Sequence, residues 1–183
     1  MIIKNRDEIS TNELREKALN IVEKGIERVL PENIMKNSVK FNDDVLIINN
    51  KEYEIKGRIF VIGAGKASGL MAESLERIIK PENITAGIVN CNSVYKTKKI
   101  IINKASHPIP DQKNMDSTKE ILSLKEKYNM TEKDIVICLI SGGGSSLMVY
   151  PEENITLENI QKINKQLLVS EADIHKINII RKH

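Results

Sequence analysis

Apolar residues near the N-terminus recur at the spacing of a helix face, whereas the rest of the chain is dominated by short apolar runs. Residues Ser10–Glu13 read Ser-Thr-Asn-Glu, a capping-box pattern that predicts a helix start. Pro31 predicts the end of this helix. The apolar positions between them fall on one stripe and indicate an amphipathic helix. The stripe consists of Leu14, Ala18, Ile21, Val22 and Val29.

Short apolar runs bounded by glycine, proline or polar residues follow this helix, and they predict strands. Val45–Ile48 and Glu52–Ile55 flank the polar segment Asn49-Asn50-Lys51, which predicts a β-hairpin. Four later runs predict the core strands of a second group. They are Arg58–Ile62, Ile84–Asn90, Lys99–Asn103 and Ile135–Ile140.

Helical patterns alternate with these core strands, at about residues 67–79 and 112–128. Thr156 predicts the cap of a further helix, and Asp173 the cap of another that reaches the C-terminus. Strands alternating with helices predict one domain over residues 1–183, a three-layer α/β/α Rossmann-like fold with a mainly parallel sheet. The side chains expected to face inward are Leu70, Ser74, Leu75 and Ile78 on the first helix, and Met115, Thr118, Ile121, Leu122 and Lys125 on the second.

Composition excludes several classes of protein. The 183 residues suffice for one domain with a real core, and 40% of them are apolar. A net charge of +3, aromatics at 3% and the lack of Trp argue against nucleic-acid and membrane partners. No signal peptide or membrane-length apolar run is evident, so a cytoplasmic protein is expected. Cys91 and Cys138 lie in or beside strand-like runs, which predicts buried reduced thiols and no metal site.

The run Ser141-Gly142-Gly143-Gly144-Ser145-Ser146 follows directly on the last core strand. Glycines let the backbone turn sharply and bring its N–H groups close to a ligand, and the serines add hydroxyl donors. At the carboxyl end of a parallel strand, this combination suits an anion, most often a phosphate. The alternative is a glycine-rich surface turn, which the entropic cost of so many glycines disfavours.

A related loop, Gly63-Ala64-Gly65-Lys66-Ala67-Ser68-Gly69, follows the first core strand. It departs from the dinucleotide fingerprint because Ser68 stands at the third glycine position and no carboxylate ends the next strand. Its spacing also differs from that of a Walker A loop. Gly63, Gly65 and Ser68 are candidates for phosphate binding, with Lys66 pairing to the phosphate. The alternative is a tight turn whose glycines only permit close helix–strand packing.

The loop Ser106-His107-Pro108-Ile109-Pro110-Asp111 follows the third core strand, and its two prolines fix its course. His107 is a candidate for substrate binding, with a satisfied loop histidine as an equal alternative. Asp111 is also a candidate, although it can equally cap the helix that follows. His175 lies on a charged helix and is expected to be merely solvated.

Four motifs occur in order along the chain, at residues Phe60–Ala67, Ser106–Asp111, Ser141–Leu147 and Asn178–His183. In that order they resemble one family, the glycerate 2-kinases associated with a MOFRL domain, some of which are named hydroxypyruvate reductases. The resemblance runs from about Ser10 to the last residue. It implies ATP- and Mg²⁺-dependent phosphorylation of D-glycerate to 2-phosphoglycerate, between a large Rossmann-like domain and a second α/β domain.

The resemblance also implies roles for individual residues. Lys66 would stabilise charge on the transferring phosphoryl group, and the backbone N–H groups of Ser141–Ser146 would hold phosphate or substrate oxygens. His107 and Asp111 would shape the glycerate pocket, and Arg181 would pair with the carboxylate of glycerate. Family members are much longer, so the chain is expected to be an N-terminal piece. The C-terminal domain would supply the remaining cationic and metal-binding groups, which implies that this piece alone is inactive.

Glu171 stands where the family usually has glycine, a departure expected to alter a helix end. Two other functions remain open. A non-catalytic module that binds a sugar phosphate or a nucleotide needs only glycine and serine loops. A hydroxypyruvate reductase needs a nicotinamide site, which the poor dinucleotide fingerprint disfavours. The sequence leaves a homo-oligomer open as well.

Overall fold

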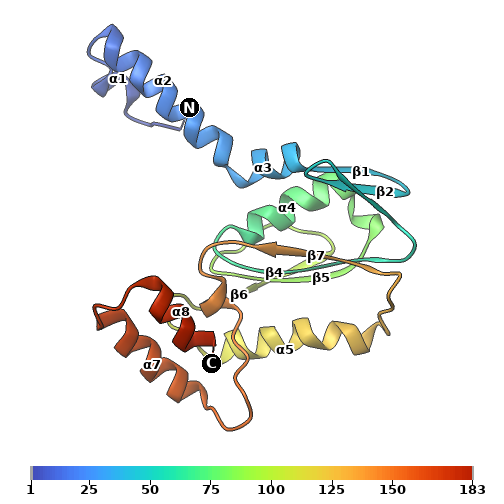
Figure 1. Ribbon diagram of the computed structural model, residues 1–183. Coiled ribbons are helices and arrows are strands. Elements are labelled where there is room, and N and C mark those ends of the chain that lie inside the picture. Colours follow the sequence, from blue (N-terminus) through green and yellow to red (C-terminus); the bar gives the residue numbers. More distant parts are fainter. Residues whose placement is uncertain (1, 183) are drawn as a thin grey trace.

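The computed structural model describes residues 2–182, and its centre is a parallel sheet with the strand order β6-β5-β4-β7 (Figure 1). The strands are β4 (Ile59–Ala64), β5 (Ile84–Cys91), β6 (Ile100–Lys104) and β7 (Ile135–Ile140). All four predicted core strands are therefore confirmed, as is the α/β class. Because the strands are parallel, their carboxyl ends meet at one edge of the sheet. This places the loops after β4, β6 and β7 at the same edge of the sheet.

One face of this sheet is covered by the helix α4 (Ser68–Ile79) and by an antiparallel meander. The meander consists of β1 (Val39–Asn42), β2 (Val45–Ile48) and β3 (Lys51–Glu54), in that order. The predicted hairpin is confirmed as β2–β3, whereas β1 was not predicted. A 3₁₀ turn, η1 (Pro81–Asn83), joins α4 to β5.

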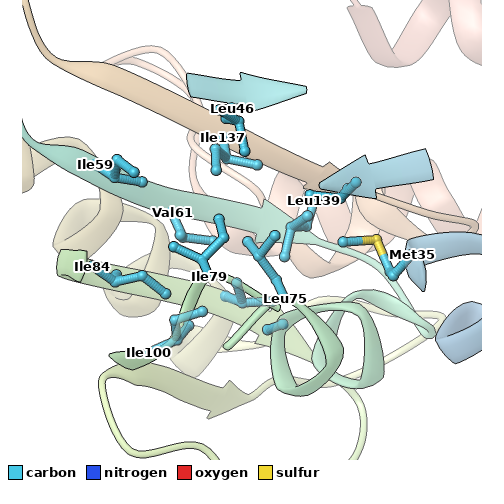
Figure 2. Close-up of a cluster of buried hydrophobic side chains, with 13 residues drawn as sticks. Met35, Leu46, Ile59, Val61, Leu75, Ile79, Ile84, Ile100, Ile137 and Leu139 are labelled. Carbon is cyan, nitrogen blue, oxygen red and sulfur yellow. The ribbon is translucent and has the colours of Figure 1, made fainter. Parts of the chain in front are cut away.

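The main core lies between α4, the meander and the sheet (Figure 2). Leu75 and Ile79 of α4 are fully buried against Val61 of β4. The predicted inward face of this helix is confirmed for Ser74 and Leu75, whereas Leu70 and Ile78 are only half-buried and Ile79 was not predicted. Leu46 of β2 lies over Ile137 of β7, so the meander closes the end of the core that α4 leaves open. Burying a large aliphatic side chain contributes about 1.5–3 kcal/mol.

The opposite face is covered by α5 (Gln112–Lys127), where Ile121 and Leu124 pack on Phe60 of β4. The predicted inward face of α5 was partly wrong, because Leu122 and Lys125 are exposed. At the start of this helix the buried side chains are polar, so the inward face lies about one position away from the one that the apolar residues alone predicted. The buried residues of α5 are Asn114, Ser117, Thr118, Ile121 and Leu124.

The strand β7 lies at an edge of the sheet, and one of its faces remains open. Val136, Cys138 and Ile140 are exposed on that face. The prediction that both cysteines are buried was therefore wrong for Cys138, although Cys91 is buried. The reason is that α5 packs over β4 and β5 and does not reach the outer side chains of the edge strand.

The N-terminal helices α1 (Arg6–Ile9) and α2 (Glu13–Val29) extend away from the sheet, to which α3 (Pro31–Ser38) connects them (Figure 1). The predicted helix is confirmed as α2, but its cap is Asn12, whose side chain accepts the Arg15 N–H. The apolar stripe of α2 is exposed, with Leu14 at 78%, and α2 has no buried residue. The amphipathic spacing predicted the helix correctly. It also implied a buried apolar face, but in this structure that face is exposed.

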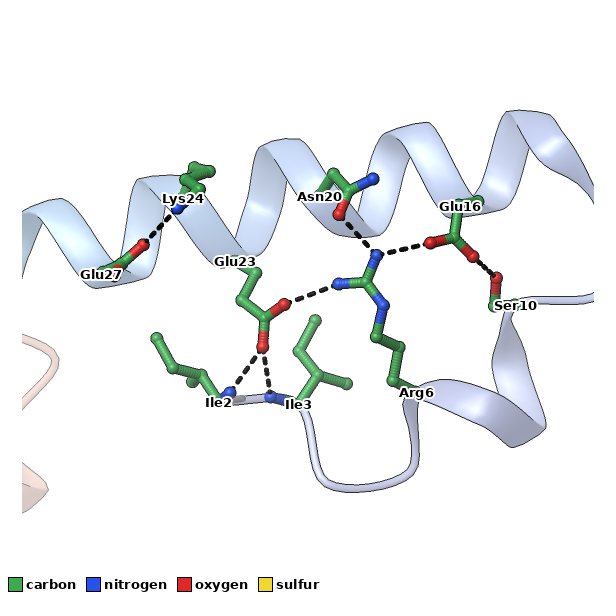
Figure 3. A network of polar contacts seen from close by, with 9 residues as sticks. All are labelled: Ile2, Ile3, Arg6, Ser10, Glu16, Asn20, Glu23, Lys24 and Glu27. Carbon is green, nitrogen blue, oxygen red and sulfur yellow. Dashed lines mark hydrogen bonds and ion pairs between the residues drawn. The ribbon is translucent and has the colours of Figure 1, made fainter.

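A polar network ties α1 to α2 (Figure 3). Arg6 is buried and donates to Glu16 at 2.9 Å and to Glu23 at 2.6 Å. The other oxygen of Glu23 accepts the backbone N–H groups of Ile2 and Ile3. The N-terminal segment is therefore held by charge-assisted hydrogen bonds instead of apolar packing.

Three short helices complete the chain, namely α6 (Gly144–Leu147), α7 (Leu157–Val169) and α8 (Ile174–Lys182). Thr156 caps α7 by accepting the Asn159 N–H at 3.2 Å, as predicted. Asp173 accepts the N–H groups of His175 and Lys176, so the predicted start of α8 is confirmed.

At the amino edge of the sheet, Asp134 pairs with Arg58 at 2.8 Å. The Arg58 side chain, with the backbone N–H groups of Thr131 and Arg58, holds the pKa of Asp134 well below its usual value. A carboxylate with a lowered pKa stabilises the fold above the unfolded-chain pKa of about 3.9 and loses this contribution as the pH falls below it. We expect the midpoint of urea unfolding to fall more steeply between about pH 5 and pH 3 in the wild type than in Asp134→Asn. Equal slopes for the two proteins would contradict this role.

Candidate functional site

The loop after β7 turns sharply at Gly143, which has a φ of 88° and forms the start of α6. The Ser141 N–H bonds to the Ala64 carbonyl, which continues the β4–β7 pairing into the loop. Further along, the N–H groups of Ser146 and Leu147 both donate to the Gly143 carbonyl. The predicted turn is therefore a defined structure at the carboxyl edge of the sheet.

Some backbone N–H groups of this loop have no acceptor among the described protein residues. Over the described range 2–182, no hydrogen bond is formed by the backbone N–H groups of Gly142, Gly143 and Ser145. Gly142 also faces open space, since a Cβ built there would have no neighbour within 4 Å. Free N–H groups in a turn with a left-handed residue form a concave site for anions. The loop therefore presents a turn with unpaired N–H donors, and anion binding there stays a prediction.

Lys66 and His107 converge on Gly143 from two other loops. A Cβ built on Gly143 would lie 2.8 Å from two ring atoms of His107 and 3.4 Å from the Lys66 Cγ. Both side chains are exposed. The loops after β4, β6 and β7 therefore bring the stem of Lys66, the imidazole of His107 and free backbone donors to one place. This convergence could not be derived from any single motif.

The loop after β4 serves mainly to pack against the loop after β7. Gly65 has a φ of 148° and lies so close to Ser141 that a Cβ would be 2.0 Å from its hydroxyl oxygen. The Lys66 N–H donates to the Gly142 carbonyl, and the Ala67 N–H to the Ser141 hydroxyl. These contacts favour the packing alternative for the backbone of this loop, and they leave the Lys66 side chain as its exposed group.

Two other candidates of this loop have similar contacts. A Cβ at Gly63 would meet the Leu139 carbonyl at 2.3 Å, so glycine permits the close pairing of β4 with β7. The Ser68 and Ser141 hydroxyl groups are 3.0 Å apart and hydrogen-bonded. Ser146 is buried and donates its hydroxyl to the Gly143 carbonyl. These three candidates therefore hold the two loops in shape.

Asp111 caps α5, which was one of its two predicted roles. Its carboxylate accepts the Lys113 and Asn114 N–H groups, and it accepts the Ser106 hydroxyl at 2.6 Å. The hydrogen bond from Ser106, followed by those from the helix N–H groups, lowers the pKa of Asp111. The carboxylate is thus ionised and already paired within its own loop.

Arg181 and Ser145 line the same cavity of about 430 Å³ between α6, α7 and α8. The Arg181 Nε donates to Asn164 Oδ1 at 2.8 Å, and Asn164 is buried, which fixes the guanidinium at this wall. The structure thus places Arg181 at a cavity that begins at the glycine loop. His183, the last residue of the Asn178–His183 motif, lies outside the described residues.

Asn114 was not predicted as a functional residue, because a single Asn inside a helical pattern carries no sequence signal. Its side chain contacts both the loop of His107 and the end of α6. The two loops that supply the exposed site groups therefore share one buried partner.

Residues 2–182 include no group of three or more His, Cys, Asp or Glu side chains arranged to hold a metal ion. In the same range, none of the helices combines the length and the apolar character that crossing a bilayer requires.

Parallel strands, glycine loops at their carboxyl edge and a convergent lysine define a Rossmann-like domain with a candidate anion site. A family model described as a domain of unknown function, DUF4147, matches residues 17–183. The chain belongs to the DUF4147 family, and it corresponds to the N-terminal domain of proteins named glycerate 2-kinase.

Similar proteins support this assignment over nearly the whole chain. A glycerate 2-kinase of Pyrococcus horikoshii is 42% identical over 171 residues, which are 93% of this chain and 38% of that protein. A crystal structure of a Pyrococcus horikoshii OT3 protein has a TM-score of 0.82 at 40% identity, over 94% of this chain and 39% of that one. A putative hydroxypyruvate reductase of Agrobacterium vitis is 36% identical over 141 residues, or 76% of this chain and 32% of that protein. The chain thus spans about 38% of the length of the first of these relatives.

Proposed function

We propose that this domain forms the phosphoryl-handling side of a cytoplasmic, ATP-dependent glycerate 2-kinase that converts D-glycerate to 2-phosphoglycerate. The observation that supports it most is the convergence of Lys66, His107 and the free N–H groups of the loop at Gly143. Phosphoryl transfer depends mainly on positioning and on neutralising charge, and these groups supply both. The names of the relatives support the substrate.

In this proposal the N–H groups of Gly142, Gly143 and Ser145 hold equatorial phosphoryl or substrate oxygens. The Lys66 ammonium neutralises charge that develops on the transferring group, where a preorganised cation stabilises the transition state. His107 bounds the same space and donates to a substrate oxygen. Asp111 contributes indirectly, since its cap fixes the loop that carries His107.

Arg181 is proposed to bind the glycerate carboxylate, because a guanidinium matches a carboxylate with two parallel hydrogen bonds. Its place in the cavity shared with Ser145 supports this role. Mg²⁺ would neutralise charge on the nucleotide phosphates, to which it usually remains bound. The described residues offer no cluster of carboxylates for it, so no step is assigned through the metal, and its protein ligands are proposed to come from the rest of a longer protein.

A hydroxypyruvate reductase is the second candidate, and the name of the Agrobacterium vitis relative favours it. The structure offers it little support, because the Lys66 and Ala67 N–H groups, which would face a dinucleotide pyrophosphate, are already bonded to the other loop. A non-catalytic sugar-phosphate module would use the same free donors at Gly143. Catalytic turnover of ATP and D-glycerate would distinguish the kinase from this non-catalytic module.

The kinase proposal is tested by measuring ADP release with ATP, Mg²⁺ and D-glycerate. We expect no turnover from residues 1–183 alone, because catalysis needs groups from both sides of a cleft. A chimera in which residues 17–183 replace the matching part of the Pyrococcus horikoshii enzyme should be active. An inactive but folded chimera, alongside an active parent enzyme, would contradict the proposal. Turnover by residues 1–183 alone would overturn the assignment of essential groups to the rest of the protein.

A further inference from the structure

Asn114, in the first turn of α5, lies completely buried beneath the two loops of the candidate site. Its Nδ2 donates to the Ser106 carbonyl at 2.8 Å and to the Ser146 carbonyl at 2.6 Å. Its Oδ1 accepts the N–H groups of Ser106 at 3.0 Å and Asp111 at 3.1 Å. The side chain thus joins the residue before His107 to the helix that follows the glycine loop.

An asparagine amide has two N–H donors and one oxygen with two lone pairs. All four positions of Asn114 are used, and every partner is a backbone group. A fully satisfied buried amide fixes its neighbours in one arrangement, because any shift leaves a buried polar group unpaired. The distance between the two loops is therefore set at this side chain.

Capping of α5 explains only one of these four bonds. In a capping box the third helical residue accepts the N–H of the cap residue, which here is the bond from Asp111 to Asn114. The two bonds to Ser106 and the bond to Ser146 serve no purpose for the helix end. They connect elements that are 8 and 32 residues away in the sequence.

The next turn of α5 extends the same connection. The Thr118 hydroxyl donates to the Asn114 carbonyl at 2.7 Å and accepts the Val149 N–H at 3.1 Å. Val149 lies just beyond α6, so two successive turns of α5 hold the segment that follows the glycine loop. Asn90 of β5 adds a bond to the Leu147 carbonyl from the sheet side.

We propose that Asn114 is a positioning residue that holds the His107 ring against Gly143 and so assembles the anion site from two loops. This role rests on the proposed function for its ligand, a phosphate group, but the loop geometry itself can be measured without a ligand. Asn114 contacts neither Lys66 nor His107 directly. It acts through Ser106 on one side and Ser146 on the other.

The test compares Asn114→Asp with Asp134→Asn in ¹⁵N-labelled protein. Asn114→Asp keeps the shape and the acceptors of the side chain but removes both donors, so the carbonyls of Ser106 and Ser146 lose their partner. Asp134→Asn perturbs a buried polar contact at the opposite edge of the sheet and controls for a general loss of stability. Thr118→Val, a milder change in the same connection, replaces Asn114→Asp if that variant does not fold.

The first measurement is the nuclear Overhauser effect between the His107 ring and the Gly143 Hα protons without ligand. We expect it in the wild type and in Asp134→Asn, and we expect its loss in folded Asn114→Asp. The second is titration with inorganic phosphate, read on the Gly142 and Gly143 amides. Affinity should fall about tenfold in Asn114→Asp, which matches the loss of about one net hydrogen bond.

A folded Asn114→Asp protein that keeps the His107–Gly143 contact would overturn the positioning role, whatever its affinity for phosphate. Equal loss of the contact in Asp134→Asn would overturn it too, since the effect would then be one of general stability. If the contact depends on Asn114 but phosphate binds to none of the proteins, the positioning role stands and the anion site of the proposed function fails.

Discussion

Replacing Lys66 with methionine in the active chimera should lower kcat by about 100-fold, the loss expected when one preorganised charge is removed from a transition state. Methionine keeps most of the apolar stem that lies near Gly143 but removes the ammonium group. The fold should be unaffected because the side chain is exposed. Initial rates of ADP release at saturating ATP and D-glycerate measure the effect.

Lys119→Met is the matched control for this experiment. Lys119 is exposed on α5 and lies outside the converging loops, so the same chemical change there should leave kcat within about twofold. Near-normal turnover of the Lys66 variant would show that Lys66 is not catalytic. A rise in KM with unchanged kcat would instead assign Lys66 to binding that is equally strong in the ground state and the transition state.

Replacing Gly143 with alanine should cause the largest loss of phosphate affinity among single methyl additions to this loop. The φ of 88° is unfavourable for a residue with a Cβ and costs about 1–2 kcal/mol. The new methyl group would also meet the His107 ring at 2.8 Å, so the ring and the backbone must move apart. A displacement of about 1 Å at a binding site can cost up to about 100-fold. Titration with inorganic phosphate and a thermal melt measure the two effects separately.

Gly142→Ala tests whether the position of the methyl group matters. A Cβ at Gly142 has no neighbour within 4 Å, so this variant should melt and bind like the wild type. If Gly143→Ala melts much lower but binds phosphate with unchanged affinity, the loop is a structural turn instead of a binding site. Equal loss of affinity in both variants would point to loop entropy as the cause.

Hydrophobic periodicity predicted most of the fold, because the central strands are apolar on both sides and bounded by glycine or polar residues. The runs at β4, β5, β6 and β7 needed no tertiary information. Periodicity failed where burial depends on neighbours. Cys138 lies on a strand as apolar as the others, yet it is exposed because no helix covers that edge.

The candidate site was predictable in its parts but not in its assembly. The glycine loops and Lys66 were recognisable from their position at strand ends, but the packing role of Gly63 and Gly65 became clear only from their contacts with Leu139 and Ser141. Lys66, His107 and Gly143 follow β4, β6 and β7, which lie far apart in the sequence. Their convergence depends on the order of these strands in the sheet, and the sequence motifs do not give that order. Asn114 could not be predicted at all, since its partners are backbone carbonyls and N–H groups that any sequence would provide.

Because α2 buries none of its residues, we expect it to open without disturbing the sheet. Its stability comes from its own hydrogen bonds and from the Arg6 network, and neither depends on the core of Figure 2. Amide protons of α2 should therefore exchange through local fraying, whereas those of β4 and β5 exchange only through global unfolding. We therefore expect the chain to unfold as two cooperative units, so that a single melting temperature would describe only the one built on the sheet.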